Sequence, residues 1–194
     1  MLNTDKTEIM AVGTSSRLSR VDCNSANIGG SSIPFKTPVK YLGVKIDQTL
    51  SMQDQISSVC RASFLALRRL ASIRPYLSER TSARLVAALI TSRLDYCNSV
   101  LAGLPAEQIG RLQRVQNSAA RLVLKKKEKK KTRKRDHITP LLSELHWLPV
   151  KFRCEDKIAT LAYRHFDGIL PSYLSASLCT YQTLRSLRSS NDKL

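Results

Sequence analysis

Hydrophobic residues recur at helical spacing through the middle of the chain. Ser78 is a suitable N-cap, and the apolar positions three and four residues apart that follow it predict a helix that runs to Gly103. Pro105 opens a second helix that continues to Leu124. Each helix gathers its apolar residues on one side, so we expect an antiparallel αα-hairpin. From periodicity alone, a structural pair in a small bundle is the simplest interpretation.

A further helix is predicted ahead of this pair. Apolar residues line one face from Ser51 onward, and Asp54 lies three residues after that serine, which resembles a capping box with Asp in place of Glu. Pro75 ends the helix. The region 48–124 is therefore expected to contain three consecutive helices.

The first 46 residues carry strand-like patterns. Residues 6–12 and 39–46 are typical of strands, and the glycine and serine pairs at 29–32 indicate a hairpin turn. Gly43 lies inside the second strand, where a glycine suggests a bulge or the close approach of another backbone. So short a segment cannot complete a sheet, and we expect the cut edge of a larger α+β domain. Met1 would then be an internal methionine used as a start, or an artefact of the gene model.

Short helices are also expected towards the C-terminus. Thr139 and Pro140 are a suitable N-cap and N1 pair, Pro149 opens a longer helix with Gly168 as its C′ residue, and Pro171 begins a last turn. The predicted fold class is mainly α with a small N-terminal β piece. The expected organisation in chain order is a β edge at 1–47, a three-helix region at 48–124, a basic disordered loop at 125–135, a helical extension at 136–180 and a flexible tail at 181–194.

Net charge changes this picture. The 194 residues include 32 Lys and Arg but only 15 Asp and Glu, a formal charge of +17. Such an excess favours a polyanionic partner, most simply nucleic acid, with an anionic membrane surface as the weaker alternative. The sequence has no apolar run long enough to span a bilayer and no secretory signal at its start. We therefore expect an intracellular protein, nuclear or cytoplasmic, without a membrane partner.

The densest positive charge lies at 125–135, with the sequence KKKEKKKTRKR. Three interpretations remain open for this run: a solvated charge cluster, a nucleic-acid contact and a nuclear import signal. The run holds nine basic residues and one acidic residue, so the rest of the chain still carries +9. The basic character therefore does not depend on this run alone.

The cysteines and histidines suggest no metal site. None of the five cysteines is spaced as C-x-x-C, and the three histidines match no ligand spacing with them. We expect most of these cysteines to be buried thiols in a reducing compartment. They are Cys23, Cys60, Cys97, Cys154 and Cys179.

Six stretches, taken in order, carry a family resemblance. They read LNTDKTEIMAVG at 2–13, VKYLGVKID at 39–47, SRLDYCNSVLAGLP at 92–105, LQRVQNSAARLV at 112–123, DHITPLLSELHWLPVKFR at 136–153 and KIATLAYRHFDGILPSYL at 157–174. Together they resemble the C-terminal part of reverse transcriptases encoded by non-LTR retrotransposons of the jockey-like kind. The resemblance covers nearly the whole chain.

This resemblance implies a role for each region. Residues 1–47 would be the C-terminal edge of the polymerase palm, with Tyr41, Leu42 and Gly43 in the primer grip that holds the nascent 3′ end. Residues 48–124 would be the thumb, which lies along the template–primer duplex, and 136–180 the family's C-terminal extension. On the thumb-like helices, the nucleic-acid-binding residues then expected are Arg61, Arg68, Arg69, Arg111, Arg114 and Arg121. From its charge, the basic run is expected to add a second patch, made of Lys125, Lys126, Lys127, Lys129, Lys130, Lys131, Arg133, Lys134 and Arg135.

The carboxylates of polymerase chemistry are missing from this chain. The family binds Mg²⁺ through a palm motif with adjacent aspartates, whereas Asp5, Asp22 and Asp47 stand alone here. Glu155 and Asp156 are adjacent but fall in a predicted helix, where neighbouring side chains point apart. We therefore expect no catalytic residue, no metal and no cofactor.

The function expected from the sequence is that of a truncated RNA-directed DNA polymerase, not itself an enzyme. Such a fragment would at most bind template–primer nucleic acid without sequence preference. The alternative is a basic helical protein-interaction module, which could be a domesticated retroelement remnant. No Ser-His-Asp, Cys-His or phosphate-loop pattern supports another enzyme class.

Overall fold

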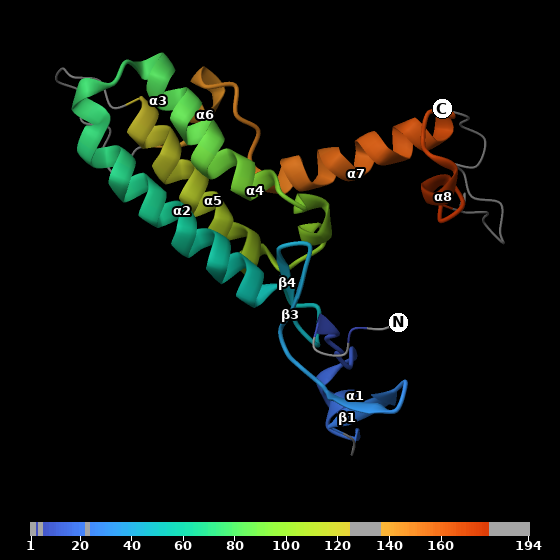
Figure 1. Cartoon of the computed structure of the whole chain (residues 1–194). Helices are drawn as coiled ribbons and strands as arrows, with labels where there is room; N and C mark the ends of the chain where they lie inside the picture. Colours follow the sequence, from blue (N-terminus) through green and yellow to red (C-terminus); the bar gives the residue numbers. More distant parts are fainter. Residues whose placement is uncertain (1–2, 4–5, 22–23, 125–136, 179–194) are drawn as a thin grey trace. The chain divides into compact units, whose positions relative to one another are not determined.

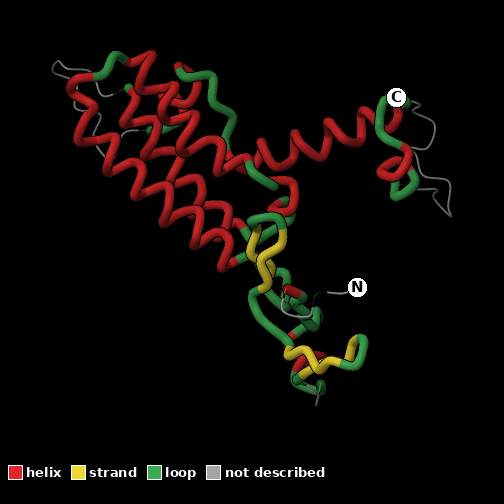
Figure 2. The backbone as a smooth tube through the Cα atoms, in the orientation of Figure 1, coloured by secondary structure: helices red, strands yellow, loops and turns green. Residues whose placement is uncertain are grey.

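The computed structural model describes residue 3 and residues 6–21, 24–124 and 137–178 (Figure 1). It contains two compact units, residues 1–155 and 156–194. The predicted fold class is confirmed, because helices dominate the described residues and the strands are short and confined to the N-terminal part (Figure 2).

The helices of the first unit form a bundle around one apolar core. In chain order the helical elements are α1 (Ser15–Leu18), α2 (Gln53–Ile73), the 3-10 turn η2 (Arg74–Tyr76), α3 (Glu79–Val86), the π-helical segment η3 (Ala87–Thr91), α4 (Ser92–Asp95), the 3-10 turn η4 (Asn98–Leu101), α5 (Ala106–Val123), α6 (Thr139–Glu144) and the start of α7 (Val150–Phe166). The side chains of Ile56, Ile90, Leu112 and Val115 are fully buried between α2, the α3–α4 segment and α5. Burial in this core accounts for the helical spacing of the apolar residues in the sequence.

The helix expected from Ser78 to Gly103 is not continuous. Ser78 caps α3 as predicted, since its hydroxyl accepts a hydrogen bond from the Thr81 N–H at 3.1 Å. The segment then widens into the π-helical turn η3 and ends at Cys97, whose φ of 53° is left-handed. A left-handed residue cannot continue an α-helix, so the chain leaves the helix there.

The strands form two separate hairpins in the described residues. β1 (Ser25–Ile28) pairs with β2 (Ser31–Pro34) around Gly29 and Gly30, as the turn signal predicted. β3 (Val39–Tyr41) pairs with β4 (Val44–Ile46), with Tyr41 opposite Val44. The predicted single strand at 39–46 is therefore wrong. Positive φ angles at Leu42 and Gly43 reverse the chain in a two-residue turn, so Gly43 is a turn residue and not a bulge.

The predicted strand at 6–12 is also wrong. In this segment Ile9 makes only an isolated bridge to Phe35. Among the described residues that precede Met52, those with buried side chains are Ile33 and Val44. The hairpins therefore add little to the core of the unit.

Asp47 caps the start of α2, where a capping box of Ser51 and Asp54 was expected. Its carboxylate accepts hydrogen bonds from the N–H groups of Ser51 and Met52, at 2.9 and 2.7 Å, and from the Thr49 hydroxyl at 2.8 Å. Partial burial raises the pKa of Asp47, but these hydrogen bonds outweigh it and lower the pKa to about 2. The loop from β4 into α2 is thus fixed by one carboxylate.

Arg74 fixes the opposite end of α2. Its guanidinium is 8% exposed and donates to the carbonyls of Leu122, Val123 and Leu77 at 2.9, 2.7 and 2.8 Å. Two of these carbonyls end α5, where a cation also complements the helix dipole. Arg74 therefore joins the C-terminal ends of α2 and α5.

The second unit contains the rest of α7 and α8 (Ser172–Ser175). Gly168 follows α7 with a φ of 70°, as expected of its C′ residue. Nδ1 of His165 and the hydroxyl of Ser175 lie 2.7 Å apart in a hydrogen bond, which holds α8 near the end of α7.

Candidate nucleic-acid interface

The helices α2 and α5 lie side by side and run in the same direction (Figure 1). Near their starts, Nη2 of Arg111 donates to the Ser57 hydroxyl at 2.8 Å. Near their ends, Arg74 contacts Leu122 and Val123. The side of α2 that carries Ser57 is therefore the side next to α5.

This alignment of α2 and α5 places five arginines on one surface, which we call the arginine face. Arg61 and Arg68 lie four and eleven residues after Ser57, about one and three helical turns further along the same side of α2. On α5, Arg114 follows Arg111 by three residues and Arg121 follows Arg114 by seven, which keeps them in one row. The arginine face consists of Arg61, Arg68, Arg111, Arg114 and Arg121.

The electrostatics of Cys60 support this placement. Burial raises the pKa of the Cys60 thiol, and the positive charges of Arg111 and Arg114 act in the opposite direction. Both arginines of α5 therefore lie close enough to α2 to affect the pKa of Cys60. The positive charge of the two helices is concentrated at their junction.

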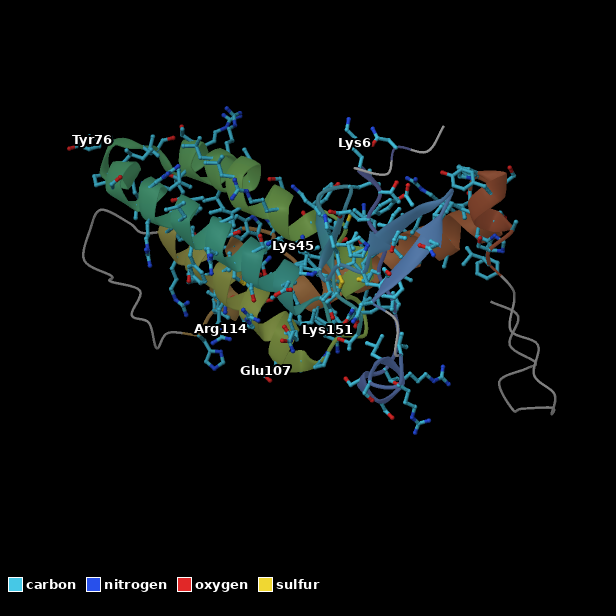
Figure 3. All side chains as sticks on the ribbon, turned by 60° about the horizontal axis from the view of Figure 1, so that its bottom comes forward. Lys6, Lys45, Tyr76, Glu107, Arg114 and Lys151 are labelled. Carbon is cyan, nitrogen blue, oxygen red and sulfur yellow. The ribbon has the colours of Figure 1, made fainter. Side chains whose placement is uncertain are left out.

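The exposed members of the arginine face lack acidic partners in the described part of the chain. Arg61, Arg68 and Arg114 are exposed, and none forms a salt bridge there. Figure 3 labels Arg114. Together α2 and α5 carry six arginines against two acidic residues, Asp54 and Glu107. A surface of this kind can accept phosphates without first breaking ion pairs. Arg111 is half-buried against Ser57 and serves partly to hold the two helices together.

The structure separates Arg69 from the other predicted arginines. It lies about 100° around α2 from Arg68, and it lines a groove between α2 and the α3–α4 segment together with Arg93. Sequence reasoning grouped Arg69 with Arg68 and did not select Arg93. The missed signal was the spacing of Arg93, four residues after Leu89 on the same side of its helix.

The hairpin tip places all three expected grip residues at the surface. The side chains of Tyr41 and Leu42 are 64% and 73% exposed, and Gly43 completes the turn. The hydroxyl of Tyr96 donates to the Leu42 carbonyl at 2.5 Å, which fixes the tip against the segment after α4. The tip is therefore rigidly held, with apolar side chains that face outward.

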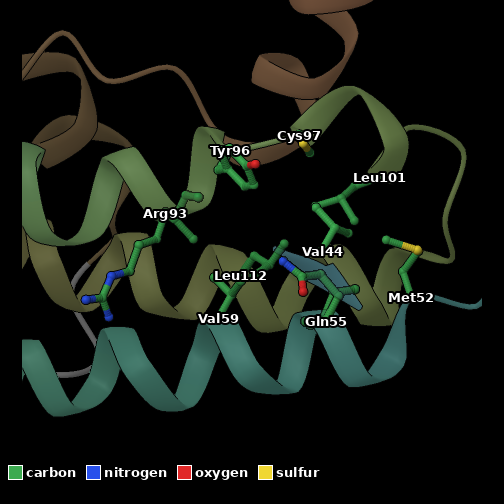
Figure 4. A pocket seen from close by; sticks show the side chains of 11 residues that line it. Val44, Met52, Gln55, Val59, Arg93, Tyr96, Cys97, Leu101 and Leu112 are labelled. Atoms are coloured by element: carbon green, nitrogen blue, oxygen red, sulfur yellow. The ribbon is translucent and has the colours of Figure 1, made fainter. Parts of the chain in front are cut away.

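Beneath the hairpin, Val44 packs into a small cavity with Met52, Tyr96 and Cys97 (Figure 4). The cavity measures about 10 Å³ and is too small for a ligand. It therefore belongs to the packing that supports the hairpin and not to a binding site.

A polar network fastens residues 148–153 to the bundle. Arg153 forms a two-pronged salt bridge with Asp95, and the side chain of Gln113 accepts a hydrogen bond from the Val150 N–H at 2.9 Å. Gln116 donates to the Leu148 carbonyl at 2.9 Å. Three of the stretches quoted for the family resemblance meet in this network, although they are far apart in the sequence.

The buried thiol of Cys154 lies within this region. Burial raises the pKa of Cys154, Asp95 and Glu155 raise it further, and Arg153 opposes them. Cys154 and Cys60 are both buried, as expected of most cysteines, whereas Cys97 is exposed. Burial therefore favours the protonated form of both Cys60 and Cys154.

The remaining predicted binding residues lie outside the described residues. These are the basic residues of 125–135, namely Lys125, Lys126, Lys127, Lys129, Lys130, Lys131, Arg133, Lys134 and Arg135. In the described ranges, no group of three His, Cys, Asp or Glu side chains could hold a metal ion. Nor does any helix of those ranges combine the length and apolar character required to cross a bilayer.

Comparisons with protein-family models, curated proteins and solved structures find no match to this chain.

Proposed function

We propose that this chain is a thumb-like module of a non-LTR reverse transcriptase, which binds duplex or hybrid nucleic acid through backbone phosphates. The observation that carries the proposal is the arginine face, a row of arginines along two adjacent, parallel helices. The order of the six stretches that resemble the family supports the same assignment. The proposal gives this chain no polymerase chemistry.

The mechanism follows from charge and geometry. On α5 the row from Arg111 to Arg121 extends over about 15 Å, since each residue adds about 1.5 Å. Guanidinium groups bind phosphate oxygens with paired hydrogen bonds, and each contact releases condensed counterions from the nucleic acid. Phosphate contacts carry no base information, so binding should not depend on sequence.

The hairpin tip extends this interface in the proposal. Tyr41 and Leu42 would contact a sugar or terminal base with apolar surface, a role similar to that of a primer grip. Their exposure and the hydrogen bond from Tyr96 support this assignment, since a rigid exposed tip loses little entropy on binding.

The direct test compares the affinity of variants for a short fluorescent RNA–DNA hybrid by anisotropy. In the main variant, Arg61, Arg68 and Arg114 are replaced by Ser, and we expect affinity to fall at least about tenfold at low salt. The control replaces two exposed arginines of the N-terminal part, Arg17 and Arg20, by Ser, and should bind almost as the unmodified chain does. Equal losses in both variants would contradict a dedicated face.

A second variant isolates the basic run. Replacing its nine basic residues at 125–135 by Ser should weaken binding but leave a measurable affinity, because the arginine face remains. Complete loss would mean that the run alone binds nucleic acid. Hybrids of scrambled sequence should bind equally well.

A further inference from the structure

A second surface of the bundle has a different chemical character. On the side of α2 that carries Arg69, a groove of about 360 Å³ lies between α2 and the α3–α4 segment. Its apolar lining remains partly open to solvent, with Leu65, Ile73 and Leu89 exposed by 48%, 44% and 39%. Exposed apolar side chains gathered in one groove mark a candidate interaction surface.

The π-helical segment η3 forms one wall of this groove. Leu89 lies in the middle of η3 and lines the groove, while its neighbour Ile90 is fully buried in the core. Just after η3, the Ser92 hydroxyl donates to the Ala88 carbonyl at 2.5 Å, which satisfies a backbone group of the widened turn. Single π-turns within helices are frequent at functional sites.

Two arginines add charge to this apolar groove. Arg69 from α2 and Arg93 from α4 both line it, and neither forms a salt bridge with any described residue. The groove thus combines an aliphatic floor with cations at its edge. Its complement is an apolar stripe flanked by carboxylates.

This chemistry distinguishes between possible occupants. No aromatic ring lines the groove, so it offers no platform for stacking bases, and phosphates would gain nothing from leucine and isoleucine. A second copy of this chain would also carry +17, and that charge opposes self-association. An acidic partner is attracted by the same charge.

We propose that the groove binds an acidic amphipathic helix of a partner protein, with leucine-like residues on the floor and carboxylates paired with Arg69 and Arg93. Helices of this kind dock in grooves through anchors spaced by three, four and seven residues. The groove and the arginine face lie on different sides of α2, so one chain can hold a partner helix and nucleic acid together.

The test uses the full chain and three synthetic helical peptides, with binding followed by fluorescence anisotropy. The first peptide carries a leucine stripe flanked by glutamates, the second has lysines in place of the glutamates, and the third has serines in place of the leucines. We expect saturable binding of the first peptide, with the second and third peptides each at least about tenfold weaker. Equal binding of the first and third peptides would show a general charge effect and overturn the proposal.

A charge-reversal variant locates the site. The double variant Arg69→Glu with Arg93→Glu should weaken binding of the acidic peptide at least about tenfold, and it should create binding of the lysine peptide. The control, Arg17→Glu with Arg20→Glu, makes the same charge change elsewhere and should alter affinity less than about twofold. Equal loss in the control would refute the groove as the site. A loss of hybrid binding in the groove variant as large as that caused by replacing Arg61, Arg68 and Arg114 would contradict the separation of the groove from the arginine face.

Discussion

Replacing Arg74 tests how the two helices of the arginine face are held in register. Arg74→Met keeps most of the side-chain length but removes three charge-assisted hydrogen bonds, two of them to the last carbonyls of α5. Each such bond contributes about 1.5–3 kcal/mol. The loss is offset in part, because a guanidinium that is 8% exposed was costly to bury. We expect a net destabilisation of about 3 kcal/mol.

Urea denaturation followed by far-ultraviolet circular dichroism measures this effect directly. For a unit of this size, about 3 kcal/mol corresponds to a fall in Tm of roughly 6–12 °C. The stability of Arg74→Lys should lie between the stabilities of the unmodified chain and Arg74→Met. A lysine ammonium group can donate hydrogen bonds to fewer of the three carbonyls than the planar, forked guanidinium does. The control Arg80→Met changes an exposed arginine of α3 and should shift stability by less than about 0.5 kcal/mol. An Arg74→Met variant as stable as this control would refute the role given to the guanidinium.

Three further predictions concern single residues. Leu42→Asn should raise the free energy of unfolding by about 1 kcal/mol in urea titrations, since Asn tolerates the positive φ that leucine adopts in this turn. Ser63→Ala should stabilise by about 1 kcal/mol in the same assay, because the Ser63 hydroxyl is fully buried without a hydrogen-bond partner among the described residues. The pKa of Asp47 is lowered to about 2 from 3.8, so its contribution, about 1 kcal/mol after solvent screening, is present above pH 3.8 and lost as the pH falls through 2. Asp47→Asn should remove that part of the pH dependence, and unchanged pH profiles would contradict the assignment.

The periodic helices could be predicted from sequence because burial decides them. The faces of α2 and α5 follow a 3.6-residue repeat, and Ser78 precedes its helix with the expected capping chemistry. The β3–β4 hairpin could not be predicted in this way. Its turn is Leu-Gly and lacks the Asn-Gly signature, so the flanking β-formers resembled one longer strand.

The site was predictable only in part, because side-chain direction depends on tertiary packing. Arg68 and Arg69 are adjacent in sequence, yet one lies next to α5 and the other lines the groove. Arg74 lies beside a proline at a helix end, and its three carbonyl partners include two that lie 48 and 49 residues away. Such contacts leave no local signal in the chain.

The salt dependence of binding tests the central claim, that the arginine face contacts phosphates. The logarithm of the binding constant for a DNA duplex is measured against the logarithm of salt concentration. Each lost phosphate contact reduces the slope by about 0.9, so replacing Arg61, Arg68 and Arg114 should make it shallower by about 2.7. The Arg17 and Arg20 control should keep the original slope. An unchanged slope in the triple variant, or binding that does not respond to salt, would contradict the account.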